Sequence, residues 1–415
     1  MLQALIVFIA IGLALVAVGG SSYIDLVMIV DETSALAAIT AIESIIMHAQ
    51  SQSRLRLNIV SNDGGSGSDK GEFEEKFLRS LSCFESLGMG MLKIAPFLPA
   101  SLVPPMLLAS CQKFKHICAR FYVPTIFPHL NDRYIYLDND VLATIDIREL
   151  WDTKIVRLAH FEEQSSIPVD KKKSRSHPQH DIEEGNRNVD GVSLSKTTLQ
   201  PMFRGKPKVP HSRRRLSVDS TKLKVLRDRN PAASFVWEKH PFYEVYIEGN
   251  FNISHPLVSA VIRKRGGKRM FFNAGIAVID VVTWNIRNVT GHFERLMLTN
   301  SDNRMFDFDS AGDQAVFYLM NDFVDLGAIP NARFNMRRLP KKTIQLLESG
   351  VSGIIHWAGT TGVHTEELCM NLDKFPLFVE SGAMSEFKKV VKSLAKRCPN
   401  SSYLYDKECL ENIHS

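Results

Sequence analysis

The chain has 415 residues, of which 45% are hydrophobic and 23% charged, so it can bury a sizeable core in one large domain or two smaller ones. Its formal net charge is +5, but residues 170–230 hold 16 Lys and Arg against 7 Asp and Glu, so the remainder of the chain is slightly acidic. Because the basic charge belongs to one segment, it does not indicate a nucleic-acid partner, and we expect none.

The N-terminus carries no charged side chain before Asp25. Its apolar stretch, Ala4–Val18, would extend about 22 Å as a helix, which is short for a bilayer core of about 30 Å. An apolar stretch of this length followed by small residues is typical of a signal peptide, here residues 1–20. The alternatives are a short uncleaved signal anchor in a membrane and a buried helix. We expect a protein of the secretory pathway, in the Golgi lumen.

Two further features bear on that location. Three Asn-x-Ser/Thr sequons, at Asn252, Asn288 and Asn400, agree with a glycoprotein, although their number is close to chance. Six cysteines form no CxxC pair and have no histidine at zinc-finger spacing, so a structural zinc is not predicted. Cys398 with Cys409 is the simplest local disulfide, and unpaired buried thiols are the alternative.

The mature chain opens with a β–α–β pattern. Tyr23–Val30 is predicted to be a buried strand that ends at Asp31, and Leu55–Val60 a second strand. Between them, Thr33–His48 has a helical apolar stripe, and Thr33 or Ser34 can cap its start. The pattern predicts a parallel sheet covered by helices.

The later elements follow from the same periodicities. We expect a loop, three strands and five helices, in chain order loop Asn62–Gly71, helix Glu72–Leu87, helix Cys118–Pro128, strand Arg133–Leu137, strand Arg269–Val281, helices Thr283–Thr299 and Ala311–Met320, strand Gly353–Trp357 and helix Ser385–Lys396. The stretch from about 165 to 230 is polar, basic and aperiodic, so it is predicted to be a disordered insertion.

Two carboxylates, Asp138 and Asp140, follow directly on the apolar strand Arg133–Leu137. In parallel α/β sheets, ligands bind outside the carboxyl ends of the strands. Two Asp residues one position apart can both reach a divalent cation there, and oxygen ligands favour Mn²⁺ or Mg²⁺. Such an ion can neutralise a diphosphate leaving group. The alternative is an Asp-rich turn after a strand.

Several blocks, in order, make the chain similar to glycosyltransferase family 8, in particular to animal glycosyltransferase 8 domain-containing proteins and plant galacturonosyltransferase-like proteins. They cover about residues 25–365 apart from the insertion. The blocks are VMIVDET at 27–33, ARFYVPTIFP at 119–128, RYIYLDNDVL at 133–142, FFNAGIAVIDVVTWN at 271–285, GDQAVFYL at 312–319, ARFNM at 332–336 and IIHWAGTTGVH at 354–364.

The resemblance implies an α/β fold of the GT-A type: a Rossmann-like nucleotide-binding sheet with a DxD motif, in a single catalytic domain with a long disordered insertion. It also implies a UDP-sugar donor, a manganese (or magnesium) ion, and retention of the anomeric configuration. The metal ligands would be Asp138, Asp140 and His356. A histidine beside two carboxylates suits Mn²⁺ better than Ca²⁺.

The resemblance also places donor-binding residues. Those expected to contact the nucleotide, the diphosphate or the sugar are Asp31, Thr33, Arg120, Asn139, Asn273, Ala274 and Gly359, together with the two aspartates of the motif. Asp313 and Gln314 would lie near the anomeric carbon, with Arg120 stabilising negative charge, and we take these three as the catalytic residues. Each of these roles has a structural alternative. These are a strand-end turn or helix cap for Asp31 and Thr33, a surface helix charge for Arg120, a turn cap for Asn273, and helix caps for Asp313 and Gln314.

One motif departs from the family. Where the family has Lys-Pro-Trp, this chain has Gly362-Val363-His364, so the lysine contact to the diphosphate is in doubt. His364, Lys341 or Lys342 are the candidates to replace it.

The chain is then divided into five parts. These are a signal peptide or anchor (1–20), a nucleotide-sugar-binding half (23–161), the basic disordered insertion (162–232), an acceptor-side half (233–375), and a C-terminal helix and tail (376–415). The expected activity is hexosyl transfer to a glycan or glycoconjugate. The alternatives are an inactive sugar-nucleotide or glycan-binding protein of the same fold, and a DxD phosphatase of the haloacid-dehalogenase type.

Overall fold

A computed structural model of the chain describes fifteen stretches, which include every site residue discussed below unless stated. They are residues 23–31, 34–50, 54–61, 77, 79–84, 90–96, 102–113, 115–158, 229–239, 243–265, 270–321, 323–324, 326–337, 352–356 and 383–398. Several sequence-based predictions lie outside them: the N-terminal segment 1–20, the loop at 62–71, the insertion up to residue 228, and the tail after residue 398. Among the described residues, no helix is both long and apolar enough to cross a bilayer.

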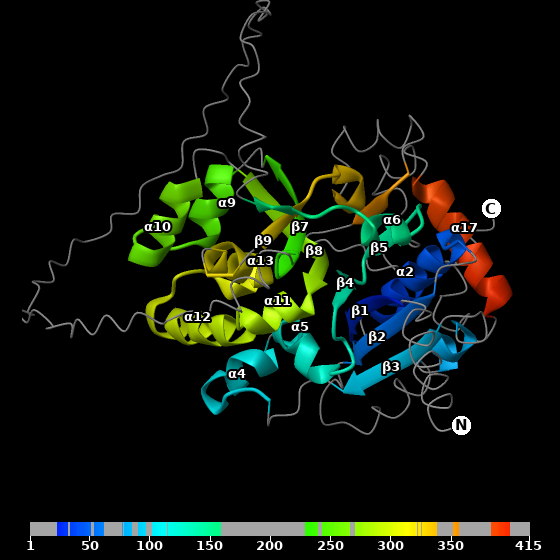
Figure 1. Cartoon of the computed structure of the whole chain (residues 1–415), viewed down its shortest axis with the longest axis horizontal. Helices are drawn as coiled ribbons and strands as arrows, with labels where there is room; N and C mark the ends of the chain where they lie inside the picture. The colour runs from blue at the N-terminus through cyan, green and yellow to red at the C-terminus, as the bar shows by residue number, and fades with distance from the viewer. Residues whose placement is uncertain are drawn as a thin grey trace, which may run out of the picture.

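The fold is built on an eight-stranded mixed sheet with the order β3-β2-β1-β4-β8-β7-β9-β6 (Figure 1). One half is parallel: β1 (Ile24–Val30) lies between β2 (Leu55–Ser61) and β4 (Arg133–Leu137), and β3 (Gly90–Pro96) pairs with β2. The helix α2 (Ala35–His48) makes the crossover that a parallel β1–β2 pair requires. The β–α–β prediction is confirmed.

The second half of the sheet comes mainly from the C-terminal part of the chain. The long strand β8 (Met270–Asp280) runs antiparallel to β4, and β7 (Ala233–Lys239) runs antiparallel to β8. Beyond them lie β9 (Leu326–Ile329), parallel to β7, and the short edge strand β6 (Val156–Arg157). One continuous sheet therefore joins residues from both sides of the insertion.

A small second sheet, β10-β11-β5, positions the site. It contains β5 (Val141–Ala143), β10 (Met336–Arg337) and β11 (Ile354–His356). The antiparallel register of β11 on β5 sets His356 opposite Val141, the residue after Asp140. Strand pairing thus brings His356 to the Asp pair.

The strands β1, β2, β4 and β9 are buried on both faces, and alternate residues enter two separate cores. In β4, Tyr134 and Tyr136 belong to one core, while Ile135 and Leu137 belong to the other. The alternation follows from the two-residue period of a strand.

Helices cover both faces. The first core packs against α5 (Lys115–Ile126), α9 (Tyr243–Asn250), α12 (Val289–Asn303) and α13 (Phe308–Met320). The second packs against α2 and α17 (Ala383–Arg397), which lie together at one end of the view in Figure 1.

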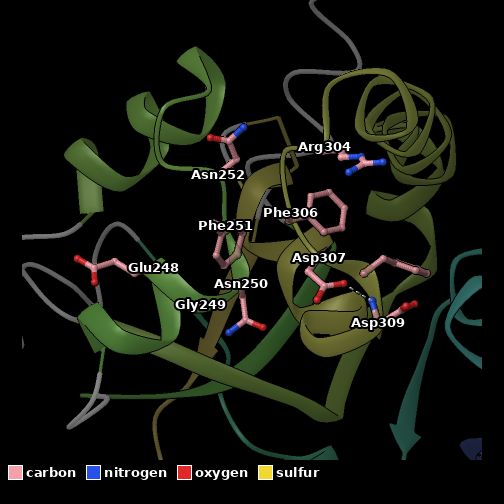
Figure 2. Close-up of a pocket in the computed structure, with 10 residues that line it drawn as sticks. Glu248, Gly249, Asn250, Phe251, Asn252, Arg304, Phe306, Asp307 and Asp309 are labelled. Carbon is pink, nitrogen blue, oxygen red and sulfur yellow. Dashed lines mark hydrogen bonds between the residues drawn. The ribbon is translucent and has the colours of Figure 1, made fainter. Parts of the chain in front are cut away.

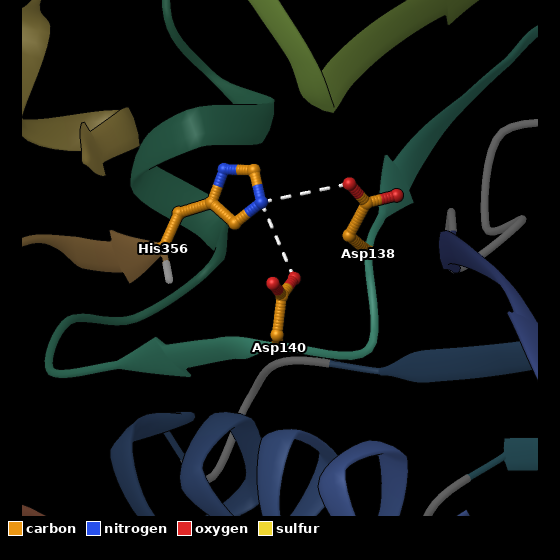
Figure 3. Close-up of side chains that lie close together, drawn as sticks. All are labelled: Asp138, Asp140 and His356. Atoms are coloured by element: carbon orange, nitrogen blue, oxygen red, sulfur yellow. Dashed lines mark ion pairs between the residues drawn. The ribbon is translucent and has the colours of Figure 1, made fainter. Parts of the chain in front are cut away.

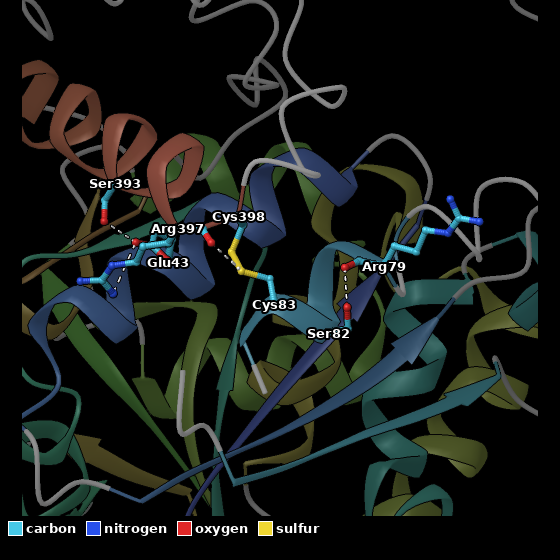
Figure 4. Close-up of a disulfide and its surroundings, with 7 residues drawn as sticks. All are labelled: Glu43, Arg79, Ser82, Cys83, Ser393, Arg397 and Cys398. Atoms are coloured by element: carbon cyan, nitrogen blue, oxygen red, sulfur yellow. Dashed lines mark hydrogen bonds and ion pairs between the residues drawn. A yellow bond between two sulfur atoms is a disulfide. The ribbon is translucent and has the colours of Figure 1, made fainter. Parts of the chain in front are cut away.

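Two disulfides are present among the described residues. Cys83 bonds to Cys398, which fastens the end of α17 to the helical residues 79–84 (Figure 4). The expected pair Cys398–Cys409 was therefore wrong: α17 ends beside Cys83, with the two Cα atoms 5.7 Å apart. Cys111 bonds to Cys118 and joins α4 (Pro105–Lys113) to α5.

Beside the Cys83–Cys398 disulfide, a polar contact holds α17 to α2. The buried Glu43 accepts a hydrogen bond from the Ser393 hydroxyl at 2.6 Å, and Nη1 of Arg397 lies 3.8 Å from the same carboxylate (Figure 4). Burial raises the pKa of Glu43, whereas Ser393 and Arg397 act to lower it.

Two local predictions need correction. The expected single helix Thr283–Thr299 is two helices, α11 (Val281–Ile286) and α12, because Asn288 between them adopts a left-handed conformation (φ 49°) that Asn tolerates better than most residues. At the start of α2, Ser34 occupies the N-cap position but its side chain does not cap the helix; it bonds to Asp31 instead. Thr33 lies outside the described residues.

Candidate metal and sugar-nucleotide site

Three side chains converge where β4 gives way to β5. The strand β4 ends at Leu137, and the backbone N–H of Asp138 donates to the carbonyl oxygen of Gly275 on β8 at 2.7 Å. A short turn then carries Asp140, and His356 arrives on β11 (Figure 3). One ligand atom from each of Asp138, Asp140 and His356 lies within 4.8 Å of the others. The structure thus brings together the three metal ligands predicted from the sequence.

The imidazole is buried and faces both carboxylates. Nε2 of His356 lies 3.2 Å from Oδ1 of Asp140 and 3.5 Å from Oδ2 of Asp138 (Figure 3). The histidine side chain is 1% exposed, whereas those of Asp138 and Asp140 are 35% and 26% exposed. The carboxylates therefore form the side of the site that a ligand from solvent can reach.

His356 and Asp138 shift each other's pKa. Burial acts to lower the pKa of His356, but hydrogen bonds to Asp138 and Asp140 outweigh it and raise that pKa to about 9. Burial acts to raise the pKa of Asp138, but His356 and Arg120 outweigh it and lower that pKa to about 2. With its pKa raised in this way, the His356 imidazole is protonated at neutral pH in the metal-free group.

The residues fit a divalent cation. Two carboxylate oxygens and one imidazole nitrogen suit Mn²⁺, and three protein ligands leave coordination positions for a substrate. Gly275 lines the same space: a Cβ there would overlap Oδ2 of Asp138 and would lie 2.5 Å from Nε2 of His356. The absence of a side chain at Gly275 is therefore what leaves room between the ligands.

Tyr136, which the sequence analysis did not single out, supports Asp138. Its hydroxyl donates to Oδ1 of Asp138 at 2.9 Å, and its ring lies under the guanidinium of Arg120, with 3.5 Å from Cζ to the ring centroid. Burial raises the pKa of Tyr136 well above its usual value, so the hydroxyl stays protonated and remains a donor. The sequence contained a signal for this contact, because residues two apart along a strand, such as Tyr136 and Asp138, lie on the same face.

Arg120 is a buried cation that organises the residues predicted to lie near the sugar (Ala274, Asp313 and Gln314), which are called the sugar side below. It lies on α5, is 4% exposed, and donates to the carboxylate of Asp313 and to the carbonyl oxygen of Ala274. Burial acts to lower the pKa of Arg120, but Asp313, Tyr136 and Asp138 raise it, and the net shift is upward. The alternative of a surface helix charge is wrong.

Asp313 and Gln314 follow a kink within α13. Gly312 has φ 55° and ψ −146°, a backbone conformation that residues other than glycine adopt only at a cost in free energy. Beyond the kink, Oε1 of Gln314 accepts from the backbone N–H of Ala274 at 3.1 Å, and its Nε2 donates to the Tyr246 hydroxyl at 3.2 Å. The structure thus brings Asp313 and Gln314 together with Arg120 and Ala274.

A second cluster lies at the carboxyl end of β1. Asp31 accepts from the backbone N–H of Ser34 at 2.9 Å and from its hydroxyl at 2.7 Å. The Asn139 amide donates to that hydroxyl at 2.9 Å and to the carbonyl oxygen of Ile29 at 2.7 Å. Asn139 therefore holds the Asp-containing turn against β1. The sequence analysis expected this residue to contact the donor, and its contacts in the structure give it a positioning role.

The remaining sequence-based candidates lie outside the described residues. They are Thr33, Gly359, and the residues considered for the diphosphate contact, Lys341, Lys342, Gly362 and His364.

A separate pocket lies between α9 and the start of α13 (Figure 2). Its lining residues include Phe251 and Phe306 on the apolar side, and Asn250, Arg304 and Asp307 on the polar side. None of the predicted site residues lines it. It is connected to the sugar side through α9, because Asn250 bonds to the Tyr246 carbonyl oxygen at 2.7 Å and Tyr246 bonds to Gln314.

Comparison with known proteins gives a match to a family model over part of the chain and a set of structural similarities. The family model described as "Glycosyl transferase family 8" matches residues 25–192, which include β1, β4 and the Asp pair. No curated protein matches the chain.

Three solved structures illustrate the similarity. Mouse xyloside xylosyltransferase 1 in its apo form has 11% identity and a TM-score of 0.42, over 82% of this chain and 99% of that one. The galactosyltransferase LgtC, solved with donor and acceptor sugar analogues, has 13% identity and a TM-score of 0.41, over 81% of this chain and 88% of that one. The WbbM bifunctional glycosyltransferase has 14% identity and a TM-score of 0.42 over 81% of this chain, which spans only 46% of its length.

The predicted α/β class is confirmed, with a mixed sheet and the Asp pair at the end of β4. The resemblance to glycosyl transferase family 8 is confirmed over residues 25–192, which are less than half of the chain.

Proposed function

We propose that this chain is a retaining, metal-dependent glycosyltransferase that moves a hexosyl or related sugar from a UDP-sugar to a glycan or glycoconjugate acceptor. One observation carries the proposal: Asp138, Asp140 and His356, from segments more than 200 residues apart, place their ligand atoms within 4.8 Å of one another at the carboxyl end of β4. That edge is where α/β sheets bind nucleotides.

The three metal ligands would act on the leaving group through the cation that they bind. Bound by these three residues, Mn²⁺ or Mg²⁺ would neutralise negative charge on the departing diphosphate. Asp138 is held in place for ligation by Tyr136 and by the backbone of Gly275, since its Oδ1 accepts from the Tyr136 hydroxyl and its N–H donates to the Gly275 carbonyl oxygen. Asn139 restrains the turn between the two ligands.

The sugar side is organised by Arg120. Because this cation holds Asp313 and the Ala274 carbonyl oxygen at once, it fixes the carboxylate relative to β8. A carboxylate held in this way stabilises positive charge that develops on the anomeric carbon as the leaving group departs. In a retaining reaction, the acceptor hydroxyl attacks from the face that the leaving group vacates, and the configuration is kept.

For the location, we propose the lumen of the secretory pathway, in the Golgi, with residues 1–20 acting as a signal peptide or a short membrane anchor. The two disulfides, Cys83–Cys398 and Cys111–Cys118, support this because disulfides persist in oxidising compartments.

A second candidate is a protein that binds sugar nucleotides without transferring them. The sequence feature that favours it is Gly362, which stands where the family has a diphosphate-binding lysine. The phosphatase alternative is not supported. In that class the first Asp is a nucleophile near the domain start, whereas here β1, β2 and β3 precede β4 in the chain, and Asp138 bonds to Tyr136 and His356.

The experiment that separates transfer from binding is a panel of UDP-sugars incubated with Mn²⁺ and scored for UDP release. An active transferase hydrolyses one of them slowly without an acceptor, and chelation of the metal stops the release. A protein that binds UDP with Mn²⁺ but releases none from any sugar, with or without a glycan acceptor, is the non-catalytic candidate.

A further inference from the structure

Asn335, at the end of the 3₁₀ helix η3 (Ala332–Asn335), connects the metal ligand His356 to the sugar-side residue Asn273. Oδ1 of Asn335 lies 3.1 Å from Nδ1 of His356. On its other side, Nδ2 of Asn335 lies 3.3 Å from Oδ1 and 3.5 Å from the carbonyl oxygen of Asn273. All three side chains are buried, so each of their polar atoms depends on a protein partner.

The donor and acceptor of each hydrogen bond between Asn273, Asn335 and His356 follow from two backbone groups. The N–H of Gly275 can only donate, and it lies 2.9 Å from the side chain of Asn273, so the atom it meets is the amide oxygen. The carbonyl oxygen of Asn273 can only accept, so the Asn335 atom beside it is the amino group. The remaining Asn335 atom, which faces Nδ1 of His356, is then the oxygen.

An amide oxygen facing Nδ1 fixes the histidine tautomer. Because that oxygen only accepts, Nδ1 must carry a hydrogen, and in the neutral imidazole Nε2 then has the free lone pair. Nε2 is the nitrogen that faces Asp138 and Asp140, while Nδ1 points away from them (Figure 3).

We propose that Asn335 is a positioning residue that holds the hydrogen of His356 on Nδ1 and thereby reserves Nε2 for a divalent cation. Asn273 and the Gly275 N–H orient Asn335 in turn, so the strand that lines the sugar side of the site also sets the protonation pattern of the metal ligand. This inference rests on the metal site of the proposed function, but not on sugar transfer.

The test compares three variants with the parent protein. Asn335→Leu keeps the approximate size but removes the acceptor. Asn335→Asp keeps an acceptor for the Nδ1 hydrogen, in the carboxylate–histidine–metal arrangement that is common in metal sites. Asn331→Ala is the matched control, since Asn331 caps the same 3₁₀ helix through the backbone N–H of Arg333 and lies at its exposed start.

Two quantities are measured: Mn²⁺ affinity by calorimetry, and the His356 tautomer by ¹⁵N NMR of imidazole-labelled protein with diamagnetic Mg²⁺ bound. The His356 signals are assigned from a His356→Gln sample. The parent should show the hydrogen on Nδ1. Asn335→Leu should weaken Mn²⁺ binding about 10- to 100-fold, the range for lost partners of metal-bound histidines, whereas Asn335→Asp should stay within about threefold and Asn331→Ala should match the parent.

Parent-like affinity and an Nδ1 hydrogen in Asn335→Leu would overturn the inference. An Nε2 hydrogen in the Mg²⁺-bound parent, or a parent that binds neither ion, would also overturn it. A parent with the expected tautomer and metal affinity that releases no UDP from any UDP-sugar leaves the inference standing and removes the proposed transfer activity instead.

Discussion

Gly275 and His356 lie so close together that no side chain fits between them. A Cβ on Gly275 would lie 2.5 Å from Nε2 of His356 and would overlap its Cε1 and the Oδ2 atom of Asp138. The backbone of β8 is therefore one wall of the metal site. A strand interior otherwise disfavours glycine, because glycine adds no packing and loses more entropy on folding.

The replacement Gly275→Ala should abolish Mn²⁺ binding, because the new methyl group occupies the space between Asp138 and His356. Calorimetry with Mn²⁺ in the presence of UDP measures this loss. Gly249→Ala is the matched control, since a Cβ at that position on α9 meets nothing within 4 Å. The control should bind Mn²⁺ as the parent does, with a melting temperature that is equal or higher. Full Mn²⁺ affinity in Gly275→Ala would contradict the placement of the site.

Metal affinity should rise with pH. In the metal-free protein the pKa of His356 is raised from 6.5 to about 9, so at pH 7 the imidazole is protonated and an incoming cation must displace that proton. The pKa of Asp138 is about 2, so this carboxylate stays ionised and adds no pH dependence above pH 4.

We therefore expect Mn²⁺ affinity to increase by up to about tenfold per pH unit between pH 6.5 and 8.5. Titrations in two buffers of different ionisation enthalpy should show about one proton released per ion at pH 7.5. The stability contribution of His356 in the metal-free protein has the matching sign: it is fully present below pH 6.5 and is lost as the pH rises through about 9. Binding without proton release would count against His356 as a ligand.

The replacement Tyr136→Phe should weaken Mn²⁺ binding by about tenfold, at the lower end of losses for partners of metal ligands. The change removes the hydroxyl that donates to Oδ1 of Asp138 at 2.9 Å but keeps the ring that packs on Arg120. Tyr134→Phe is a suitable control, because Tyr134 is buried in the same core from the same strand. Equal losses in both variants would indicate a general packing defect and not a contact to the ligand.

The replacement Asp313→Asn should reduce sugar transfer strongly while Mn²⁺ affinity stays within a few-fold of the parent. Asp313 pairs with the buried Arg120 on the sugar side, whereas the metal ligands are Asp138, Asp140 and His356. Breaking a buried pair also costs stability, on the order of 3–5 kcal/mol, so melting curves accompany the assay.

Asp309→Asn, earlier in the same helix, is the control. Asp309 pairs with Lys113 at 3.0 Å and both side chains are more than half exposed, so its loss should change stability by less than about 1 kcal/mol. Unchanged turnover in Asp313→Asn would show that this carboxylate takes no part in the chemistry.

Local patterns were enough to predict much of the fold. The strand Arg133–Leu137 has the predicted bounds, and α2 begins within two residues of its predicted start, because both have clear apolar periodicity. The position of the Asp pair at a strand end was enough to propose a cation site there. His356 required the family resemblance, because nothing near it in sequence indicates that β11 will pair with β5.

The parts that could not be predicted depend on long-range packing. Cys83 and Cys398 are separated by 315 residues, so a pairing based on proximity in sequence selected Cys409 instead. Asn335 lies within a block that the resemblance identified, but its role depends on side-chain contacts with Asn273 and His356 that no spacing reveals. The division of the expected helix at Asn288 depends on one left-handed residue.

The most direct test of the central claim is a calorimetric titration of UDP into the parent protein and into Asp138→Asn and Asp140→Asn, each with and without Mn²⁺. The account predicts UDP binding by the parent that requires Mn²⁺, and loss of that binding in both variants. Both variants should remain folded, because the two carboxylates are partly exposed and their replacement leaves no cavity. Undiminished Mn²⁺-dependent binding of UDP in either variant would contradict the account.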